Sequence, residues 1–364
     1  MHNQTLVTWQ TLGSWMAKRS LKTPDKTALI VAGDERVTYR ELADRVDGIA
    51  TVLWHRGIRK GDSVAYLGEN SQDFVAALFA CAQLGAVFVP VNTRLAPPEI
   101  LHVLSDAQAR AVIHDPEFTD RLTPLASAVG IEHIIQTGET GADASPGLAA
   151  LARSAPASSF EAEVTLDDPA AIIYTSGTTG RAKGAILTHQ NLTWVALNTI
   201  VDYDIVSSDV ALMISPLFHV AALGMGALPT ILKGGTIVLE KSFDPGRALA
   251  LIERHGVTML SGVPTTYQLL ADHPDWASTD LSTLQKLTCG GSAVPTRILN
   301  AFEQRGLSFS QGYGMTETSP GATALSPEMT RAKQGSVGLP HFFNDVRIAD
   351  EHGAIVPTGA IGEI

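Results

Sequence analysis

The chain has 364 residues, of which 45% are hydrophobic and 17% charged, and its formal net charge is −11. Such an apolar, weakly charged composition excludes a disordered protein, and the length predicts about two domains with a sizeable packed core. Nucleic-acid-binding proteins usually carry an excess of basic residues, whereas this chain has an excess of acidic ones, so we expect no nucleic-acid partner. A local cationic site for a single anion is compatible with it.

Neither the cysteines nor the N-terminus indicates a secreted protein. Cys81 and Cys289 are far apart and form no disulfide framework or metal-binding spacing. No basic segment followed by an apolar one opens the chain, so no signal peptide is expected. Residues 74–91 are apolar enough to raise a membrane span, but Gly85 and Pro90 interrupt them. We predict a buried helix followed by a buried strand, and a cytoplasmic protein without an integral membrane segment.

The first part of the chain alternates short apolar runs with helical patterns. Thr38 and Glu41 have the spacing of a capping box, which predicts a helix that begins there and ends near His55. Strands separated by helices indicate right-handed βαβ crossovers and a mostly parallel sheet. Strands are expected at 28–31, 64–67, 87–91, 111–114 and 133–136, and further helices at 71–84, 97–105 and 117–129.

The same alternation resumes later in the chain. Residues 137–163 shift to Gly, Ala, Ser and Pro and are predicted to form a surface connection. Further strands are expected at 170–174, 211–215, 235–239, 258–261, 286–289 and 308–311, and helices at 191–200, 245–255 and 295–304. The predicted fold is α/β, with two mostly parallel sheets flanked by helices in a layered arrangement, plus a small β-barrel-like segment near the C-terminus. Approximate lobes are residues 1–165, 166–330 and 331–364.

The most informative stretch is a polar loop after the strand predicted at 170–174. It reads Thr175-Ser176-Gly177-Thr178-Thr179-Gly180-Arg181-Ala182-Lys183-Gly184. Its glycines let backbone N–H groups approach an anion, its hydroxyls add donors, and Lys183 supplies a positive charge. A plain flexible loop is the competing interpretation. Neither a Walker A loop nor a dinucleotide fingerprint has this spacing. Because an apolar run follows at 185–187, the loop is predicted to join two strands.

The loop resembles the phosphate loop of the adenylate-forming superfamily, which contains acyl-CoA synthetases, firefly luciferase and nonribosomal peptide adenylation domains. Segments that are similar to other family motifs follow in the family's order. Residues 92–95, with Pro98 and Glu99, also resemble the N-terminal lobe of fatty-acid CoA ligases. The remaining matches are 216–219 (Pro-Leu-Phe-His), 290–295 (Gly-Gly-Ser-Ala-Val-Pro), 311–317 (Gln-Gly-Tyr-Gly-Met-Thr-Glu), 335–340 and 359–364.

Two features depart from the family pattern. Ala182 stands where the family often has proline. Family members also continue past a Gly-Glu-Ile strand to a ribose-binding aspartate, a hinge and a small C-terminal lid with a catalytic lysine. We therefore expect residues 1–364 to be the N-terminal adenylating core, without the lid domain and without full activity on their own.

The resemblance implies a two-step reaction. A carboxylic acid attacks the α-phosphate of ATP and releases pyrophosphate, and the thiol of coenzyme A then captures the acyl-adenylate. Lys183, Thr316 and Glu317 are the implied catalytic residues. Glu317 would bind Mg²⁺, with the Thr175 hydroxyl as a second ligand. Thr316 would donate to the α-phosphate, or serve as a helix N-cap.

The nucleotide site implied by the resemblance is assembled from three motifs. The loop would hold the β- and γ-phosphates, and Tyr313 would stack on adenine, although a buried core tyrosine is the competing interpretation. The implied ATP-binding residues are Thr175, Ser176, Gly177, Thr178, Thr179, Gly180, Lys183, Gly291, Ser292, Gly312, Tyr313, Gly314, Met315 and Thr316.

The implied acid-binding site is apolar. His219 would orient the carboxylate, unless it is an ordinary core histidine, and Val220, Ala222 and Leu223 would line the acyl pocket. No acidic residue stands ready to pair with an ammonium group, which argues against an amino-acid substrate. A medium- or long-chain fatty acid is favoured; an aryl-acid CoA ligase and a non-catalytic ATP- or AMP-binding protein are the alternatives. His189 is expected to be structural, and a homo-oligomer is compatible with the sequence.

Overall fold

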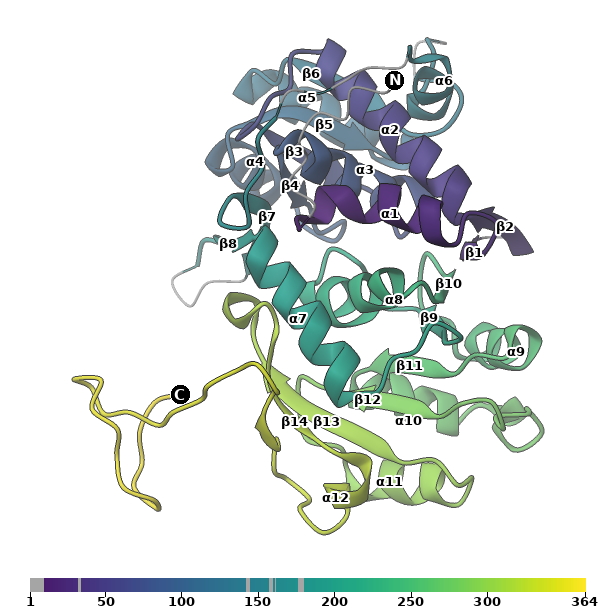
Figure 1. Ribbon diagram of the computed structural model, residues 1–364, viewed down its shortest axis with the longest axis vertical. Helices are drawn as coiled ribbons and strands as arrows, with labels where there is room; N and C mark the ends of the chain where they lie inside the picture. The colour runs from purple at the N-terminus through teal and green to yellow at the C-terminus, as the bar shows by residue number, and fades with distance from the viewer. Residues whose placement is uncertain (1–9, 32–33, 142–144, 157–159, 161, 176–179) are drawn as a thin grey trace.

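The computed structural model describes residues 10–31, 34–141, 145–156, 160, 162–175 and 180–364. Across these residues two β-sheets lie one above the other in Figure 1, with helices on their faces. The predicted α/β class and layered arrangement are confirmed.

The smaller sheet has six strands in the order β6-β5-β3-β4-β7-β8. Neighbouring strands are parallel from β6 to β7, whereas β8 forms an antiparallel hairpin with β7. Its strands are β3 (Ser63–Leu67), β4 (Val87–Pro90), β5 (Ala109–His114), β6 (His133–Gln136), β7 (Pro169–Thr175) and β8 (Lys183–Thr188).

The larger sheet has nine strands in the order β15-β14-β13-β12-β11-β9-β10-β1-β2. Strands β13 to β1 are parallel, and the outer strands β2, β14 and β15 are antiparallel to their neighbours. Its strands are β1 (Thr27–Val31), β2 (Glu35–Thr38), β9 (Val210–Met213), β10 (Thr236–Leu239), β11 (Met259–Gly262), β12 (Lys286–Cys289), β13 (Phe309–Gly314), β14 (Gly321–Leu325) and β15 (Leu339–Pro340).

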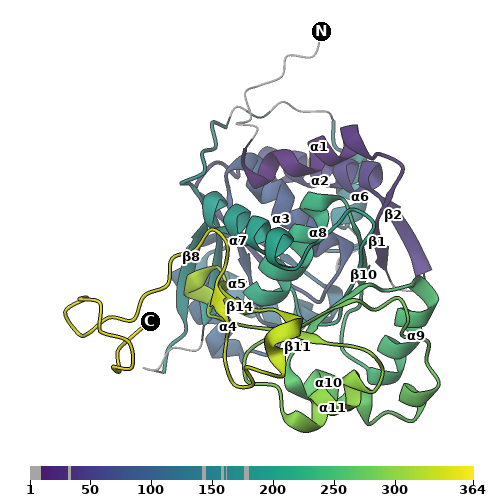
Figure 2. The same ribbon diagram turned by 60° about the horizontal axis from the view of Figure 1, so that its bottom comes forward.

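Helices cover both faces of both sheets (Figures 1 and 2), as buried parallel strands require. The largest apolar cluster lies between the sheets and contains Phe79 of α3, Leu192 of α7, Phe88 of β4 and Ile237 of β10. A second cluster packs α9, α10 and α11 on the larger sheet, and a third packs α4 and α5 on the smaller. The helices are α1 (Trp15–Lys22), α2 (Tyr39–His55), α3 (Gln72–Leu84), α4 (Pro97–Asp106), α5 (Thr119–Val129), α6 (Leu148–Ser154), α7 (His189–Asp202), α8 (Leu228–Lys233), α9 (Pro245–His255), α10 (Pro264–Ala271), α11 (Thr296–Glu303) and α12 (Pro327–Thr330).

The two sheets exchange strands across residue 165. β1 and β2, from the predicted first lobe, extend the larger sheet, where Leu29 pairs with Ile237. β7 and β8, from the predicted second lobe, extend the smaller sheet, where Ala171 pairs with Phe88. The sheets therefore do not follow the order of the sequence.

Local sequence patterns predicted several helices and strands correctly. The Thr38 hydroxyl accepts from the Glu41 amide at 3.2 Å, and the Glu41 carboxylate accepts from the Thr38 amide at 2.8 Å. The helix that begins there ends at His55, as predicted. Residues 74–91 form most of helix α3 and then strand β4, joined at Gly85 with a φ of +67°, so the predicted helix and strand are confirmed. In the described part of the chain, no helix combines the length and apolarity that a membrane crossing requires.

Other expectations were wrong or incomplete. The connection predicted at 137–163 contains helix α6, whose Leu148 and Ala149 are buried. α6 packs closely on α2, because a Cβ at Gly48 would lie 2.5 Å from the Ala152 carbonyl oxygen. The β-barrel-like segment after residue 330 is not confirmed. β15 joins the larger sheet instead, and Ala349 forms isolated bridges with Ile355 and Glu363.

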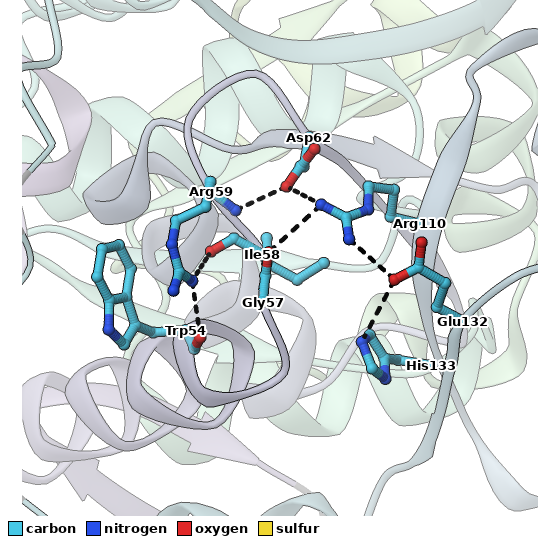
Figure 3. A network of polar contacts seen from close by, with 8 residues as sticks. All are labelled: Trp54, Gly57, Ile58, Arg59, Asp62, Arg110, Glu132 and His133. Carbon is cyan, nitrogen blue, oxygen red and sulfur yellow. Dashed lines mark hydrogen bonds and ion pairs between the residues drawn. The ribbon is translucent and has the colours of Figure 1, made fainter.

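Figure 3 shows a polar network at the amino ends of the smaller sheet's strands. The Arg110 guanidinium on β5 donates to Asp62, before β3, and to Glu132, before β6, both at 2.8 Å. The Arg59 guanidinium lies over the Trp54 ring, with its carbon 3.6 Å from the ring centroid. Binding sites in such sheets lie at the carboxyl ends of the strands. This network therefore connects the strands at the end of the sheet where no binding site is expected.

Candidate functional site

Part of the expected phosphate loop lies outside the described residues, namely Ser176, Gly177, Thr178 and Thr179. The described ends of the loop confirm that it joins two strands. Thr175 is the last residue of β7 and Lys183 the first of β8, and the two are paired across the hairpin. Thr175 is half-buried, whereas Gly180 and Lys183 are exposed.

Helix α4 supports the base of this hairpin. The Tyr174 hydroxyl donates to the Asp106 carboxylate at 2.7 Å, and burial followed by this contact raises the pKa of Tyr174. His102 Nε2 lies 2.9 Å from the Ala182 carbonyl oxygen, so Nε2 is the donor. Sequence reasoning missed both supports. His102 and Asp106 are four residues apart and therefore share a helix face, but nothing in the sequence says where that face points.

The turn that contains Glu317 lies against β8, so the structure brings the second motif to the hairpin. Thr316–Thr318 form a single 3₁₀ turn after β13. The Glu317 carboxylate is exposed and has no hydrogen-bond or ion-pair partner among the described residues. The N-cap alternative for Thr316 is wrong, because Met315 precedes the turn and the Thr318 hydroxyl accepts from its amide at 3.0 Å.

Gly314 lets the chain double back at this turn. A Cβ at this position would lie 1.5 Å from the Pro320 carbonyl oxygen, so only glycine fits there without backbone movement. Residue 314 pairs with Gly321 and Tyr313 with Thr323, which returns the chain along β14. Tyr313 is half-buried and Met315 exposed, while a Cβ at Gly312 would approach the Thr323 carbonyl oxygen to 2.8 Å.

The Gly291 segment lies at the end of the adjacent strand. Gly291 follows β12 with a φ of +80°, a conformation that favours glycine, and both Gly291 and Ser292 are exposed. The amide of Val294 donates to Gln311 Oε1 at 3.1 Å, which ties this turn to β13. The two nucleotide motifs of the larger sheet therefore meet at the carboxyl ends of neighbouring parallel strands.

The His219 segment reaches the same region from β9. It leads into a π-helix, Ala221–Ala227, and a Cβ at Gly224 would lie 3.0 Å from Pro320 Cδ. The His219 side chain is exposed, whereas Val220, Ala222 and Leu223 belong to the apolar cluster between the sheets. Desolvation, followed by the positive charge of Arg94, lowers the pKa of His219.

The metal site expected at Glu317 stays a prediction. No cluster of three or more His, Cys, Asp or Glu side chains suited to a metal occurs within the described ranges. Mg²⁺ needs no such cluster, because it is commonly held by one or two carboxylates together with phosphates and water. The exposed, unpartnered carboxylate of Glu317 has the chemistry and the access that this arrangement requires.

His189, at the start of α7, makes the stability of the protein depend on pH. Its ring is completely buried and neither nitrogen has a hydrogen-bond partner in the part of the chain that the structure describes. Burial lowers the pKa of His189 from 6.5 to about 4. Between these values the unfolded chain binds a proton that the folded chain does not, so stability is retained above pH 6.5 and falls as the pH decreases toward 4.

We expect the free energy of unfolding to decrease less between pH 6.5 and pH 4 in His189→Leu than in the unaltered protein. The shift from 6.5 to about 4 corresponds to at most about 3.5 kcal/mol, since one pKa unit corresponds to about 1.4 kcal/mol. Urea unfolding followed at pH 7, 6, 5 and 4.5 measures the difference. Parallel loss in both proteins would show that His189 is not the responsible group.

The comparisons with known proteins identify the family. The model of the family described as AMP-binding enzyme matches residues 16–364. The chain belongs to this family.

Relatives of this AMP-binding enzyme are CoA ligases and synthetases. A feruloyl-CoA synthase from Amycolatopsis sp is 46% identical over 98% of this chain and 69% of its own length. An indoleacetate–CoA ligase from Aromatoleum aromaticum is 35% identical over 97% of this chain and 69% of its own length. The enzyme is accordingly an AMP-forming acid–thiol ligase.

Solved structures agree with this assignment. The N-terminal domain of FACL13 from Mycobacterium tuberculosis superposes with a TM-score of 0.87 at 31% identity, covering 95% of this chain and 86% of that one. The anthranilate CoA ligase AuaEII gives a TM-score of 0.89 at 25% identity, covering 97% of this chain and 67% of that one. The match to an N-terminal domain agrees with the expectation that residues 1–364 form the adenylating core.

Proposed function

We propose that this AMP-binding enzyme converts an aromatic carboxylic acid into its CoA thioester, with a ferulate-like arylacrylic acid as the preferred substrate. The observation that carries the proposal is the 46% identity with feruloyl-CoA synthases along nearly the whole chain. Our sequence-based preference for a fatty acid is not confirmed. A fatty acid remains the second candidate, because a long-chain-fatty-acid–CoA ligase from Mycobacterium tuberculosis is 32% identical over 97% of the chain.

In this proposal the hairpin and the 3₁₀ turn hold the triphosphate between them. Lys183 adds positive charge near the phosphates, and the Thr316 hydroxyl donates to the α-phosphate. Glu317 would hold Mg²⁺, with Thr175 as a second oxygen ligand, and the ion would supply positive charge that neutralises the phosphates. Since the protein supplies no nucleophile, catalysis here consists of positioning and charge stabilisation.

The adenine and the acid contact different motifs around this centre in the proposal. Tyr313 stacks on adenine, with Gly291 and Ser292 beside it at the end of β12. His219 faces the acid, and its lowered pKa keeps the imidazole uncharged at neutral pH. It therefore orients the carboxylate through a hydrogen bond rather than through an ion pair.

A substrate panel tests the proposal directly. The full-length native protein is incubated with ATP, Mg²⁺, coenzyme A and one carboxylic acid. The acids compared are ferulic, benzoic, indoleacetic, octanoic and palmitic acid. Mass spectrometry then measures AMP and the acyl-CoA. We expect kcat/KM for ferulic acid to exceed that for the fatty acids by at least about tenfold, a typical discrimination between apolar substrates of different shape.

The other outcomes separate the alternatives. A higher kcat/KM for palmitic acid would replace the aromatic substrate with the fatty acid. Release of ADP instead of AMP would contradict adenylation altogether. Binding of ATP without turnover of any acid would favour the non-catalytic alternative.

A further inference from the structure

One buried asparagine connects the two sheets next to the proposed site. Asn70 lies in the loop between β3 and α3, and its side chain bonds to backbone groups of the larger sheet's connections. Its Nδ2 donates to the carbonyl oxygens of Ser215 and Glu240, both at 2.9 Å. Its Oδ1 accepts from the Leu217 amide at 2.7 Å. The residue is 5% exposed, so these bonds are shielded from water.

Two of the three groups that Asn70 binds belong to the segment that ends at His219. Ser215 and Leu217 lie between β9 and that histidine, and Glu240 follows the adjacent parallel strand β10. The His219 amide donates to the Pro216 carbonyl oxygen at 3.1 Å, and its own carbonyl accepts from Leu223 at 3.2 Å. Asn70 therefore holds the residues just before His219 and connects them to the end of β10.

Asn70 is itself held by rigid parts of the smaller sheet. The Asp115 carboxylate, at the end of β5, accepts from the Glu69 amide and from the Thr137 hydroxyl, each at 2.8 Å. On the other side of Asn70, the Ser71 hydroxyl accepts from the Phe74 amide at 3.1 Å and so caps α3. The loop is thus fixed at both ends, which limits where the Asn70 amide can point.

We propose that Asn70 is a positioning residue that sets the place of His219 relative to the phosphate-binding hairpin. The hairpin belongs to the smaller sheet, whereas His219 follows a strand of the larger one. Attack of a carboxylate on a phosphate requires the reacting atoms to approach to about 3–3.5 Å, so the two sheets must keep a fixed relation. The role assigned to His219 rests on the proposed function.

The first test measures the loop itself and does not depend on activity. Asn70→Ala, made in the whole native chain, removes the three bonds without adding a charge. Amide hydrogen exchange of the peptide spanning residues 214–220 should become faster, because the Leu217 amide loses its acceptor. Thr236→Val is the matched control, since it removes a buried hydrogen bond, 2.8 Å to the Thr27 carbonyl oxygen, that lies at the other end of β10. Exchange no faster than in this control would overturn the inference.

The second test asks whether Asn70 acts through His219. We expect Asn70→Ala to lower kcat for adenylate formation by about 100-fold, the scale of a misplacement near 1 Å, with a smaller effect on the KM for ATP. In a His219→Ala background the same substitution should have little further effect. A merely structural role predicts instead that the two losses multiply, and that result would overturn the proposal.

If Asn70→Ala fails to fold, a second variant provides the test. Asn70→Asp keeps the size and the acceptor for Leu217 but sets a carboxylate oxygen against two carbonyls. This repulsion should move residues 215–217 away from the side chain and weaken the Leu217 bond as well, so exchange should again be faster and the effect on kcat should again depend on His219; failure on either count overturns the inference. Turnover of the unaltered protein tests the proposed function separately, so the two failures are distinguishable.

Discussion

Glu317→Gln is expected to reduce the rate of adenylate formation by at least about 100-fold, a loss typical of removing one charge-stabilising group. The substitution keeps the shape of the side chain and removes the charge that would hold Mg²⁺. Because Glu317 is exposed and unpartnered among the described residues, folding should not depend on it. Pyrophosphate release under saturating ATP measures the rate, and a Mg²⁺ titration should show a higher requirement for the metal.

The control is an exposed acid in the C-terminal segment, outside the motifs that form the candidate site. Glu351→Gln removes the same charge from a side chain that is 87% exposed and should leave pyrophosphate release unchanged. Thermal unfolding should be the same for all three proteins. A near-normal rate for Glu317→Gln would remove Glu317 from the proposed metal site.

Gly314→Ala is expected to lower the free energy of unfolding by at least about 2 kcal/mol and to abolish most adenylate formation. The added Cβ would stand 1.5 Å from the Pro320 carbonyl oxygen, a backbone atom that cannot be displaced by a rotamer change. β13 and β14 must therefore separate where Tyr313, Thr316 and Glu317 are held. Urea unfolding and pyrophosphate release are the measurements.

A second glycine in the adjacent strand end provides the steric control. A Cβ at Gly290 would meet nothing closer than the Gly312 carbonyl oxygen at 3.9 Å, so Gly290→Ala should change the free energy of unfolding little. Equal stabilities for the two variants would mean that the chain relaxes around residue 314. Gly314 would then have no steric role in shaping the turn.

Local signals predicted much of the fold. The Thr38 capping box and the apolar run at 74–91 predicted their elements because both patterns act over a few neighbouring residues. The hydroxyl-rich loop and the apolar run after it likewise predicted a connection between two strands, which the structure shows to be an antiparallel pair. Helix α6 was missed, because seven residues rich in alanine and leucine were hidden by the Gly, Ala, Ser and Pro around them.

The support of the candidate site was not predictable in the same way. His102 and Asp106 act on the hairpin, and Asn70 acts on the His219 segment, through contacts between parts of the chain that are far apart in sequence. The orientation of residues 220–223 could not be predicted from the sequence for the same reason. An apolar run predicts contact with apolar groups, but only the packing of the two sheets places Val220, Ala222 and Leu223 in the apolar cluster between them.

The exchange of strands between the sheets has a consequence for how the protein is made. β1 and β2 leave the ribosome early, yet their partner β10 is synthesised much later, since Leu29 pairs with Ile237. β1 can pair with β2 as soon as both are made, but the other edge of this apolar strand stays open until β10 has been synthesised. Sequence-distant pairing of this kind slows folding and exposes strand edges to aggregation. We expect the nascent enzyme to depend on chaperones during translation more than a protein built from two consecutive lobes would.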